Sequence, residues 1–227
     1  MAGWKSWKPP IDSLRLVENR DMLTTTLLLG PKDHGRAVSD EELEFADYRL
    51  GYDYEVIFGR LYVSPAPNRE HDVVEKHIYN QVYIYSVDHP EVVGYVTDRA
   101  RVFVPSEQKT TAPEPDLAIY AEDSDDWRDD EPFIVGEVLR GEDVDKDLFR
   151  NVDLYLRVPS IQEYWVFDIR ENSRRPMLLV HRRTRDGWDI SELPPDAIYE
   201  TPLLPGLRLQ ISPPPRRSTK RSRTRRS

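Results

Sequence analysis

Apolar residues recur along this chain with two spacings, one typical of helices and one typical of strands. In residues 69–87 they return every three or four positions, which predicts an amphipathic helix with Val74, Ile78, Val82 and Tyr85 on its buried face. A similar pattern over residues 147–157 predicts a second helix that ends before Pro159. Ser39 and Glu42 match a capping box and predict a short helix ahead of both.

Runs rich in β-branched and aromatic residues predict the strands. Tyr54–Phe58 and Arg60–Val63 flank Gly59 and are typical of a tight hairpin. Single strands are expected at residues 92–97, 100–104, 117–120, 133–139 and 163–169, and a second hairpin at residues 177–183 and 188–193. This order of elements predicts an α/β (α+β) fold in which a mixed sheet is flanked by helices.

Composition divides the chain into three parts. Residues 1–37 are rich in proline and polar residues and are expected to form a loosely attached N-terminal arm, whereas residues 38–212 form the folded domain. Residues 213–227 contain mainly Pro, Arg and Ser, and this composition predicts a disordered tail.

Charge is distributed unevenly between the domain and its tail. Residues 216–227 contain seven Lys or Arg and no acid, and without them the net charge of −9 becomes −16 for residues 1–215. An acidic body argues against broad adhesion to nucleic acid, although it allows a local basic groove. The basic tail has three open interpretations: a solvated end, a contact with nucleic acid, or a contact with the acidic loop at residues 122–131.

Several classes of protein are disfavoured by what the sequence lacks. It has no run of about 18 apolar residues, so no membrane span is expected. Its first ten residues do not follow the pattern of a signal peptide. It has no cysteine, which excludes disulfides and thiolate metal sites and fits a cytoplasmic protein.

Two acidic residues stand at the edges of apolar runs that are expected to be buried strands. Asp116 follows Pro115 and precedes residues 117–120, and Glu137 interrupts the run at residues 133–139. Burying an unpaired carboxylate costs several kcal/mol, so a divalent cation shared by Asp116 and Glu137 is the leading interpretation, with the backbone carbonyl of Val138 as a third ligand. The structural alternative is that Asp116 caps a turn and Glu137 pairs with an arginine.

Four segments carry a resemblance to a known family. They are Pro115–Ile119, Val135–Leu139, Asp147–Tyr155 and Ile161–Asp168. Together they closely resemble the Uma-type family of proposed restriction endonucleases, which belongs to the PD-(D/E)XK nuclease superfamily. The predicted hairpin at residues 54–63 also looks like the opening hairpin of that family, and the resemblance spans about residues 39–210.

The resemblance implies a restriction-endonuclease-like fold and Mg²⁺-dependent hydrolysis of DNA phosphodiester bonds, with Mn²⁺ as a possible substitute and a homodimer as the assembly. It assigns Asp116 and Glu137 as the metal-binding acids. Glu55 resembles a strand-borne acid of the family, which either supports the metal or pairs with Arg60. His71 matches a histidine at the start of a helix, which either faces Asp116 or is only structural.

One departure from the family pattern bears directly on activity. The family's lysine stands four residues before the helix tyrosine, but in this chain the position is Asn151, ahead of Tyr155. An amide cannot supply positive charge, and Lys146 is expected to lie about 140° away around an α-helix. Three functions therefore stay open: an active endonuclease, a catalytically impaired nuclease-fold protein that binds DNA or regulates, and an acidic protein-interaction domain.

Overall fold

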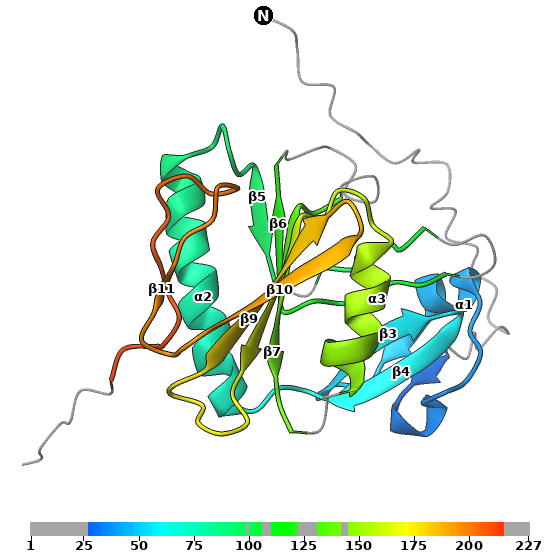
Figure 1. Cartoon of the computed structure of the whole chain (residues 1–227). Helices are drawn as coiled ribbons and strands as arrows, with labels where there is room; N and C mark the ends of the chain where they lie inside the picture. The colour runs from blue at the N-terminus through cyan, green and yellow to red at the C-terminus, as the bar shows by residue number, and fades with distance from the viewer. Residues whose placement is uncertain (1–26, 99, 106–109, 122–130, 142–144, 216–227) are drawn as a thin grey trace, which may run out of the picture.

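The centre of the protein is a six-stranded mixed sheet with the strand order β10-β9-β8-β7-β6-β5 (Figure 1). The computed structural model describes residues 27–98, 100–105, 110–121, 131–141 and 145–215. The strands of this sheet are β5 (Tyr95–Thr97), β6 (Leu117–Tyr120), β7 (Ile134–Leu139), β8 (Glu163–Asp168), β9 (Met177–Thr184) and β10 (Gly187–Leu193). Strands β7 and β8 are parallel, and the other neighbouring pairs are antiparallel. The predicted mixed sheet flanked by helices is confirmed.

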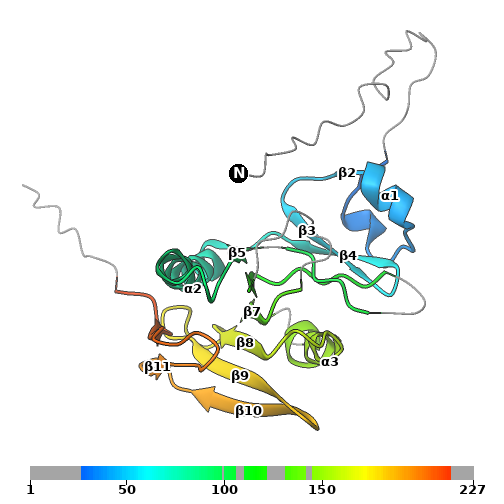
Figure 2. The same ribbon diagram turned by 90° about the horizontal axis from the view of Figure 1, so that it is seen from above.

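Helices cover the two faces of this sheet (Figure 2). Helix α2 (Arg69–Asp88) packs on one face, and α3 (Asn151–Leu156), preceded by the π-helical turn η3 (Lys146–Arg150), packs on the other. Successive strand residues point to opposite faces, so Val138 belongs to the core beneath α2 whereas Val135 and Leu139 belong to the core beneath α3. Glu137 therefore points toward α3.

The sequence signals for the helices are confirmed by their contacts. The Ser39 hydroxyl accepts a hydrogen bond from the Glu42 amide at 3.1 Å at the start of α1 (Asp40–Phe45). The Asn68 side chain accepts hydrogen bonds from the amides of Glu70 and His71, which fixes the first turn of α2. All four apolar positions predicted for the buried face of α2 are buried.

A separate two-stranded sheet, β3 (Tyr52–Ile57) and β4 (Arg60–Pro65), forms the predicted hairpin. Its turn places Phe58 and Gly59 at φ values of 50° and 69°, the combination that favours a glycine in a two-residue turn. A single β-bridge joins Val56 to Ala112, in the segment that leads into β6. This bridge holds β3, and with it Glu55, beside the end of the central sheet.

The described part of the predicted N-terminal arm is packed rather than loosely attached. Strand β1 (Leu28–Leu29) pairs with β2 (Asp47–Tyr48), and a 3₁₀ turn, η2 (Pro31–Asp33), follows β1. Leu29 is fully buried against the β3–β4 hairpin, a contact that composition alone does not predict. Residues 1–26 lie outside the described residues.

The C-terminal strands β11 (Ile198–Tyr199) and β12 (Leu209–Gln210) lie beside α2 (Figure 1). They are tied to the sheet by Glu163, which is fully buried at the start of β8. Its carboxylate accepts hydrogen bonds at 2.7–2.9 Å from Trp165, Arg182, Tyr199 and Thr201. The predicted tail at residues 216–227 and most of the acidic loop, residues 122–130, lie outside the described residues.

Two strand predictions need correction. Residues 100–104 do not form a strand: the amides of Val102 and Val104 bond to the carbonyls of Pro113 and Thr111, but Pro113 has no N–H with which to continue a ladder. The strand expected at residues 92–97 is confirmed only for the residues of β5. His181 lies within β9 between the rings of Tyr164 and Trp188 and is only 3% exposed. Among the described residues, no helix is long and apolar enough to cross a membrane.

Candidate functional site

A small cavity of about 30 Å³ lies where the start of α2, the β3–β4 hairpin, the ends of β6 and β7 and the turn η3 meet. Its lining includes five residues that the sequence singled out: Glu55, His71, Asp116, Glu137 and Val138. Lys146 and Asp147 also line it. The fold thus brings the predicted acids together in one place, although they are up to 82 positions apart in the chain.

Asp116 is held at the cavity by the sheet and by α2. The register of β6 and β7 pairs Leu117 with Gly136, so Asp116 lies one residue beyond, next to Glu137. Its Oδ2 atom accepts hydrogen bonds from the Val138 amide at 2.8 Å and from His71 Nε2 at 2.9 Å. Burial alone would raise the pKa of Asp116, but the His71 hydrogen bond and charge outweigh it and lower that pKa. Asp116 is therefore ionised at neutral pH.

Glu137 is buried beside Asp116 and is held by α3. Its Oε1 atom accepts hydrogen bonds from Asn151 Nδ2 at 2.9 Å and from the Tyr155 hydroxyl at 3.2 Å. Burial raises its pKa well above the ordinary value, and the nearby charges of Asp147 and Asp116 add to the effect. Glu137 is thus a carboxylate whose ionised form needs additional positive charge.

Lys146 supplies part of that charge, contrary to the sequence-based expectation. Its Nζ atom lies 3.5 Å from Glu55, 3.8 Å from Asp147 and 4.0 Å from Glu137. The expected 140° separation assumed an α-helix, but residues 146–150 form a π turn in which the Asn151 amide donates to the Lys146 carbonyl. Hydrogen bonding between residues five apart brings Lys146 and Asn151 to the same side of the helix, where both reach Glu137.

Glu55 faces Arg150 rather than Arg60. Its Oε2 atom is 2.8 Å from Arg150 Nη2, and its Oε1 atom accepts a hydrogen bond from the Glu114 amide at 3.2 Å. Burial raises the pKa of Glu55, but the charges of Lys146 and Arg150 outweigh it and lower that pKa. Arg60 instead donates to the Gly35 carbonyl. Glu55 therefore positions the two cations of η3 at the cavity.

His71 links the cavity to α2. Its Nε2 atom bonds to Asp116, and its Nδ1 atom lies 3.2 Å from Glu75 Oε2, one turn further along the helix. Burial would lower the pKa of His71, but the hydrogen bond to Asp116 and the charges of both acids raise it to about 9. Of the two sequence-based interpretations, the structure shows the one in which His71 faces Asp116.

Two contributors to the site were not anticipated as such: Lys146 and the Tyr155 hydroxyl. The Tyr155 ring is fully buried, and only its hydroxyl reaches Glu137. The side chain of Asp147 is 3% exposed and lies near Lys146. The spacing of Lys146, Asn151 and Tyr155 could have identified Lys146 and Tyr155. Five residues separate the first pair and four the second, which is the spacing of one π turn followed by one α turn.

The donor set fits a hard divalent cation. Glu55, Asp116, Glu137 and Asp147 are four of the six acids that line the cavity, and burial keeps the pKa of Glu137 raised although Lys146 lies near it. Oxygen ligands of this kind suit Mg²⁺ and Mn²⁺. Asp116 and Glu137 would hold such an ion. A role for the Val138 carbonyl stays a prediction, whereas the Val138 amide donates a hydrogen bond to Asp116.

Comparisons with known proteins identify the fold and the family of this chain. A solved structure of a putative nuclease belonging to DUF820, from Anabaena variabilis, is similar with a TM-score of 0.58 and 16% identity, over 75% of this chain and 93% of that one. At this low identity the likeness shows the fold alone. Among curated proteins, no relative matches the chain. Residues 41–212 match the sequence profile described as "Uma2: Putative restriction endonuclease". With three quarters of its length matched, this chain belongs to the Uma2 family.

Proposed function

We propose that this protein is an endonuclease that hydrolyses DNA phosphodiester bonds with Mg²⁺, for which Mn²⁺ can substitute. Membership of a family of putative restriction endonucleases supports nuclease chemistry. The observation that carries the proposal is that Asp116, Glu137 and Lys146 line the same cavity. Two carboxylates can hold a divalent cation, and an ammonium group can stabilise the negative charge of a phosphoryl transition state.

Each side chain has a distinct part in this proposal. Asp116 and Glu137 bind the cation, which when bound would lower the pKa of a water molecule and offset phosphate charge. Asn151 and Tyr155 hold Glu137 Oε1, and the Oε2 atom is the one nearest Lys146. The ammonium group of Lys146 supplies positive charge where negative charge develops on the phosphate.

The position of Lys146 is also the reason to prefer an active enzyme over an impaired one. The impaired alternative rested on Asn151, which cannot replace the charge of a lysine. Lys146 Nζ lies 4.0 Å from Glu137. The ammonium group near Glu137 therefore belongs to residue 146, which stands at the opposite end of the π turn from Asn151. Asn151 keeps a neutral role as a hydrogen-bond donor to Glu137.

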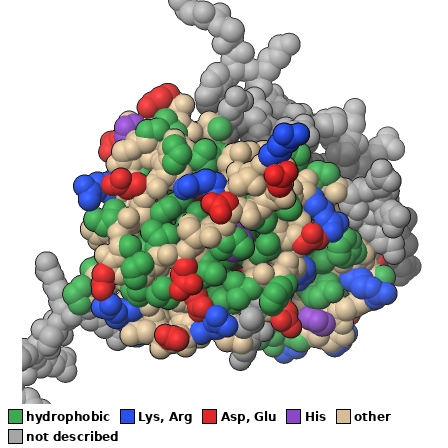
Figure 3. Space-filling model, in the orientation of Figure 1, with side chains coloured by type: hydrophobic (Ala, Val, Ile, Leu, Met, Phe, Trp, Pro, Cys, Tyr) green, Lys and Arg blue, Asp and Glu red, His purple; other side chains and the backbone are tan. Residues whose placement is uncertain are grey.

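DNA would approach the mouth of the cavity rather than enter it. A space of about 30 Å³ holds an ion or a water molecule, not a nucleotide. On the described part of the face seen in Figure 3, acidic and basic side chains are interspersed and form no continuous basic surface. The basic residues at 216–227 are therefore our candidate for a sequence-independent contact with the phosphate backbone.

We propose a homodimer, since cleavage of both strands of a duplex needs two such cavities. Support comes from the outward face of α2, where Tyr83, Ile84 and Val87 are 50%, 63% and 64% exposed. Sedimentation of the full chain tests the assembly: a concentration-independent monomer would contradict it.

Salt-dependent DNA binding of a variant that lacks residues 216–227 tests the tail, and unchanged affinity at every salt concentration would exclude its contact.

Nicking of supercoiled plasmid tests the activity itself. Wild-type protein should nick with Mg²⁺ or Mn²⁺ and not with a chelator, and Asp116→Ala and Glu137→Ala should each abolish nicking. Asp186→Ala is the matched control, because Asp186 is an exposed acid in the β9–β10 turn, away from the residues that line the cavity. Nicking that survives both cavity substitutions would contradict the proposal.

A further inference from the structure

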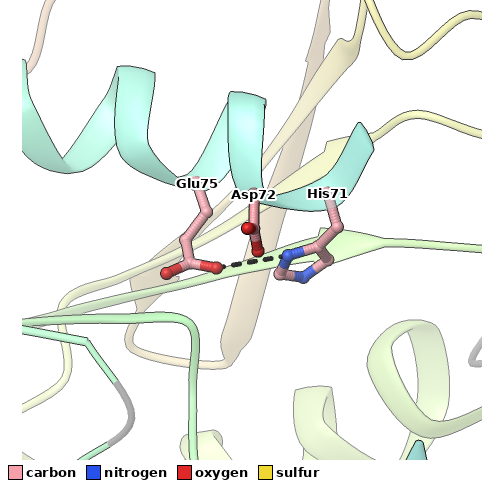
Figure 4. Close-up of side chains that lie close together, drawn as sticks. All are labelled: His71, Asp72 and Glu75. Carbon is pink, nitrogen blue, oxygen red and sulfur yellow. Dashed lines mark ion pairs between the residues drawn. The ribbon is translucent and has the colours of Figure 1, made fainter. Parts of the chain in front are cut away.

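A second group of metal-ligating side chains lies on the first two turns of α2, next to the acid pair but separate from it. Candidate ligand atoms of His71, Asp72 and Glu75 all lie within 4.8 Å of one another. Figure 4 shows the three side chains converging below the helix, with Asp72 between the other two. The spacing of His71 and Glu75, four residues apart, places both on one face of the helix.

Two buried atoms in this group lack hydrogen-bond partners among the described residues. They are His71 Nδ1 and Glu75 Oε2, and their side chains are only 3% and 5% exposed. They form an ion pair at 3.2 Å, drawn as a dashed line in Figure 4, but do not meet the geometry of a hydrogen bond. Buried polar atoms are nearly always satisfied, and an orphaned one costs about 1–3 kcal/mol, so a missing ligand is a direct explanation.

The distance between these atoms matches that expected for two ligands of one tetrahedral ion. Nitrogen and oxygen ligands lie about 2.0–2.2 Å from Zn²⁺, so two of them at a tetrahedral angle are about 3.3–3.5 Å apart. The observed separation of 3.2 Å is close to that value. An ion between Nδ1 and Oε2 would therefore need little movement of either side chain.

The other nitrogen of His71 is already oriented as metal-binding histidines usually are. Its Nε2 atom bonds to the Asp116 carboxylate at 2.9 Å, which leaves Nδ1 directed toward Glu75. A carboxylate behind the histidine fixes the ring and makes it a better ligand. The same contact places Asp116, a ligand of the proposed hard-cation site, one hydrogen bond away from the group on α2.

Asp72 provides a route from solvent. Its side chain is 40% exposed and lines a surface hollow of about 500 Å³ together with Lys76 and His77. Two features oppose a cation here: the positive end of the α2 dipole and the Lys76 ammonium, 3.3 Å from Asp72. Lys76 is 65% exposed and can turn into water, and the carboxylates of Asp72 and Glu75 outweigh the partial charge of the helix.

We propose that His71 Nδ1, Glu75 and Asp72 form a binding site for a borderline divalent cation of the Zn²⁺ class. This site goes beyond the proposed nuclease function and does not depend on it. An imidazole ligand favours Zn²⁺ and Co²⁺, whereas Mg²⁺ prefers oxygen ligands and keeps its waters. The protein would thus carry two adjacent cation sites of different selectivity, a hard one at Asp116 and Glu137 and a softer one on α2.

Calorimetric titration of the full chain with Zn²⁺ alone tests the site, with Co²⁺ absorption as a report on coordination. Wild type should bind one Zn²⁺ at this site, and Glu75→Gln and His71→Gln should each weaken binding by about tenfold or more. Glu70→Gln and His77→Gln are the matched controls, because they change the same residue types on α2 outside the cluster. Both should bind Zn²⁺ as the wild type does.

Glu137→Gln distinguishes the new site from the acid pair. It should leave Zn²⁺ affinity within about twofold of wild type, and about a hundredfold excess of Mg²⁺ should not displace the Zn²⁺. Loss of binding in Glu137→Gln would place the ion at the acid pair and overturn the proposal, as would wild-type affinity in Glu75→Gln or no binding at all. Glu75→Gln preserves side-chain size, so it decides the matter if His71→Gln does not fold.

Discussion

Replacing Lys146 by methionine should remove most of the nuclease activity that we propose. The substitution keeps an unbranched chain of similar length and deletes only the ammonium group, which lies 3.5–4.0 Å from three carboxylates. At about 4 Å and an effective dielectric constant near 20, one such pair is worth about 4 kcal/mol. Without it the pKa of Glu137, already raised by burial, rises further, and the protonated acid cannot bind a cation.

The same reasoning predicts that the charge can be returned from the other end of the π turn. Asn151 Nδ2 lies 2.9 Å from Glu137 Oε1, so a lysine at this position would place its ammonium group near the same carboxylate. Lys146→Met should lower the nicking rate by about 10²–10³-fold, the usual effect of deleting one electrostatic stabiliser. The double variant Lys146→Met/Asn151→Lys should recover much of the loss, whereas Asn151→Lys alone should give no gain.

Plasmid nicking over a range of Mg²⁺ concentrations and pH values measures these effects. A higher pH should partly rescue Lys146→Met, because it ionises Glu137 without the help of the lysine. Lys76→Met is the control, since Lys76 is 65% exposed on α2. The reasoning is refuted if Lys146→Met nicks like the wild type. It is also refuted if an inactive wild type gains activity from Asn151→Lys alone.

Three further predictions concern buried groups whose partners are known. Glu163→Gln should lower the free energy of unfolding by about 1–3 kcal/mol, because the single carbonyl oxygen of glutamine cannot accept hydrogen bonds from both Trp165 and Arg182. Thermal melting checks this against the exposed control Glu192→Gln. Burial lowers the pKa of His181, so the neutral histidine stabilises the fold above the ordinary pKa near 6.5, and that stability is lost as pH falls. The melting temperature of His181→Phe should therefore depend less on pH below 6.5 than that of the wild type. An unchanged dependence would contradict this. Asp116→Asn should lower the pKa of His71 from about 9 toward its ordinary value, as NMR titration of the ring would show. A pKa that stays near 9 would contradict the assigned cause. In the wild type, the stability from this pair is fully present below about pH 6.5 and is lost as the pH rises through about 9.

Much of the fold follows from local rules that the sequence states directly. The capping pair Ser39 and Glu42 and the turn at Gly59 depend on neighbours a few positions away, so they could be predicted without a structure. The pairing of Asp116 with Glu137 was also within reach, because both acids interrupt apolar runs that had to become buried strands. The side chains that contact the two acids could not be predicted in the same way, because they belong to α2, β3 and η3, which lie outside the two apolar runs.

The failures have a common physical origin in backbone hydrogen bonding. Lys146 was placed outside the site because a π turn was not considered, and a shift from four-residue to five-residue hydrogen bonds rotates a side chain by more than a quarter turn. Residues 100–104 look like a strand, but their partner segment contains Pro113, which has no amide hydrogen. In both places the decisive fact is which backbone groups bond to each other.

The two acids of the site are positioned by helices on opposite faces of one sheet. His71 on α2 holds Asp116, and Asn151 and Tyr155 on α3 hold Glu137. The gap between the carboxylates therefore depends on the packing of both helices, whereas the positive charge beside them comes from η3 and is held there by Glu55 of β3. Because a π turn presents positions 146 and 151 to the same carboxylate, a lysine can stand at either one without moving the acids. The departure at Asn151 thus moves the positive charge to residue 146, and the arrangement of Asp116 and Glu137 does not have to change with it.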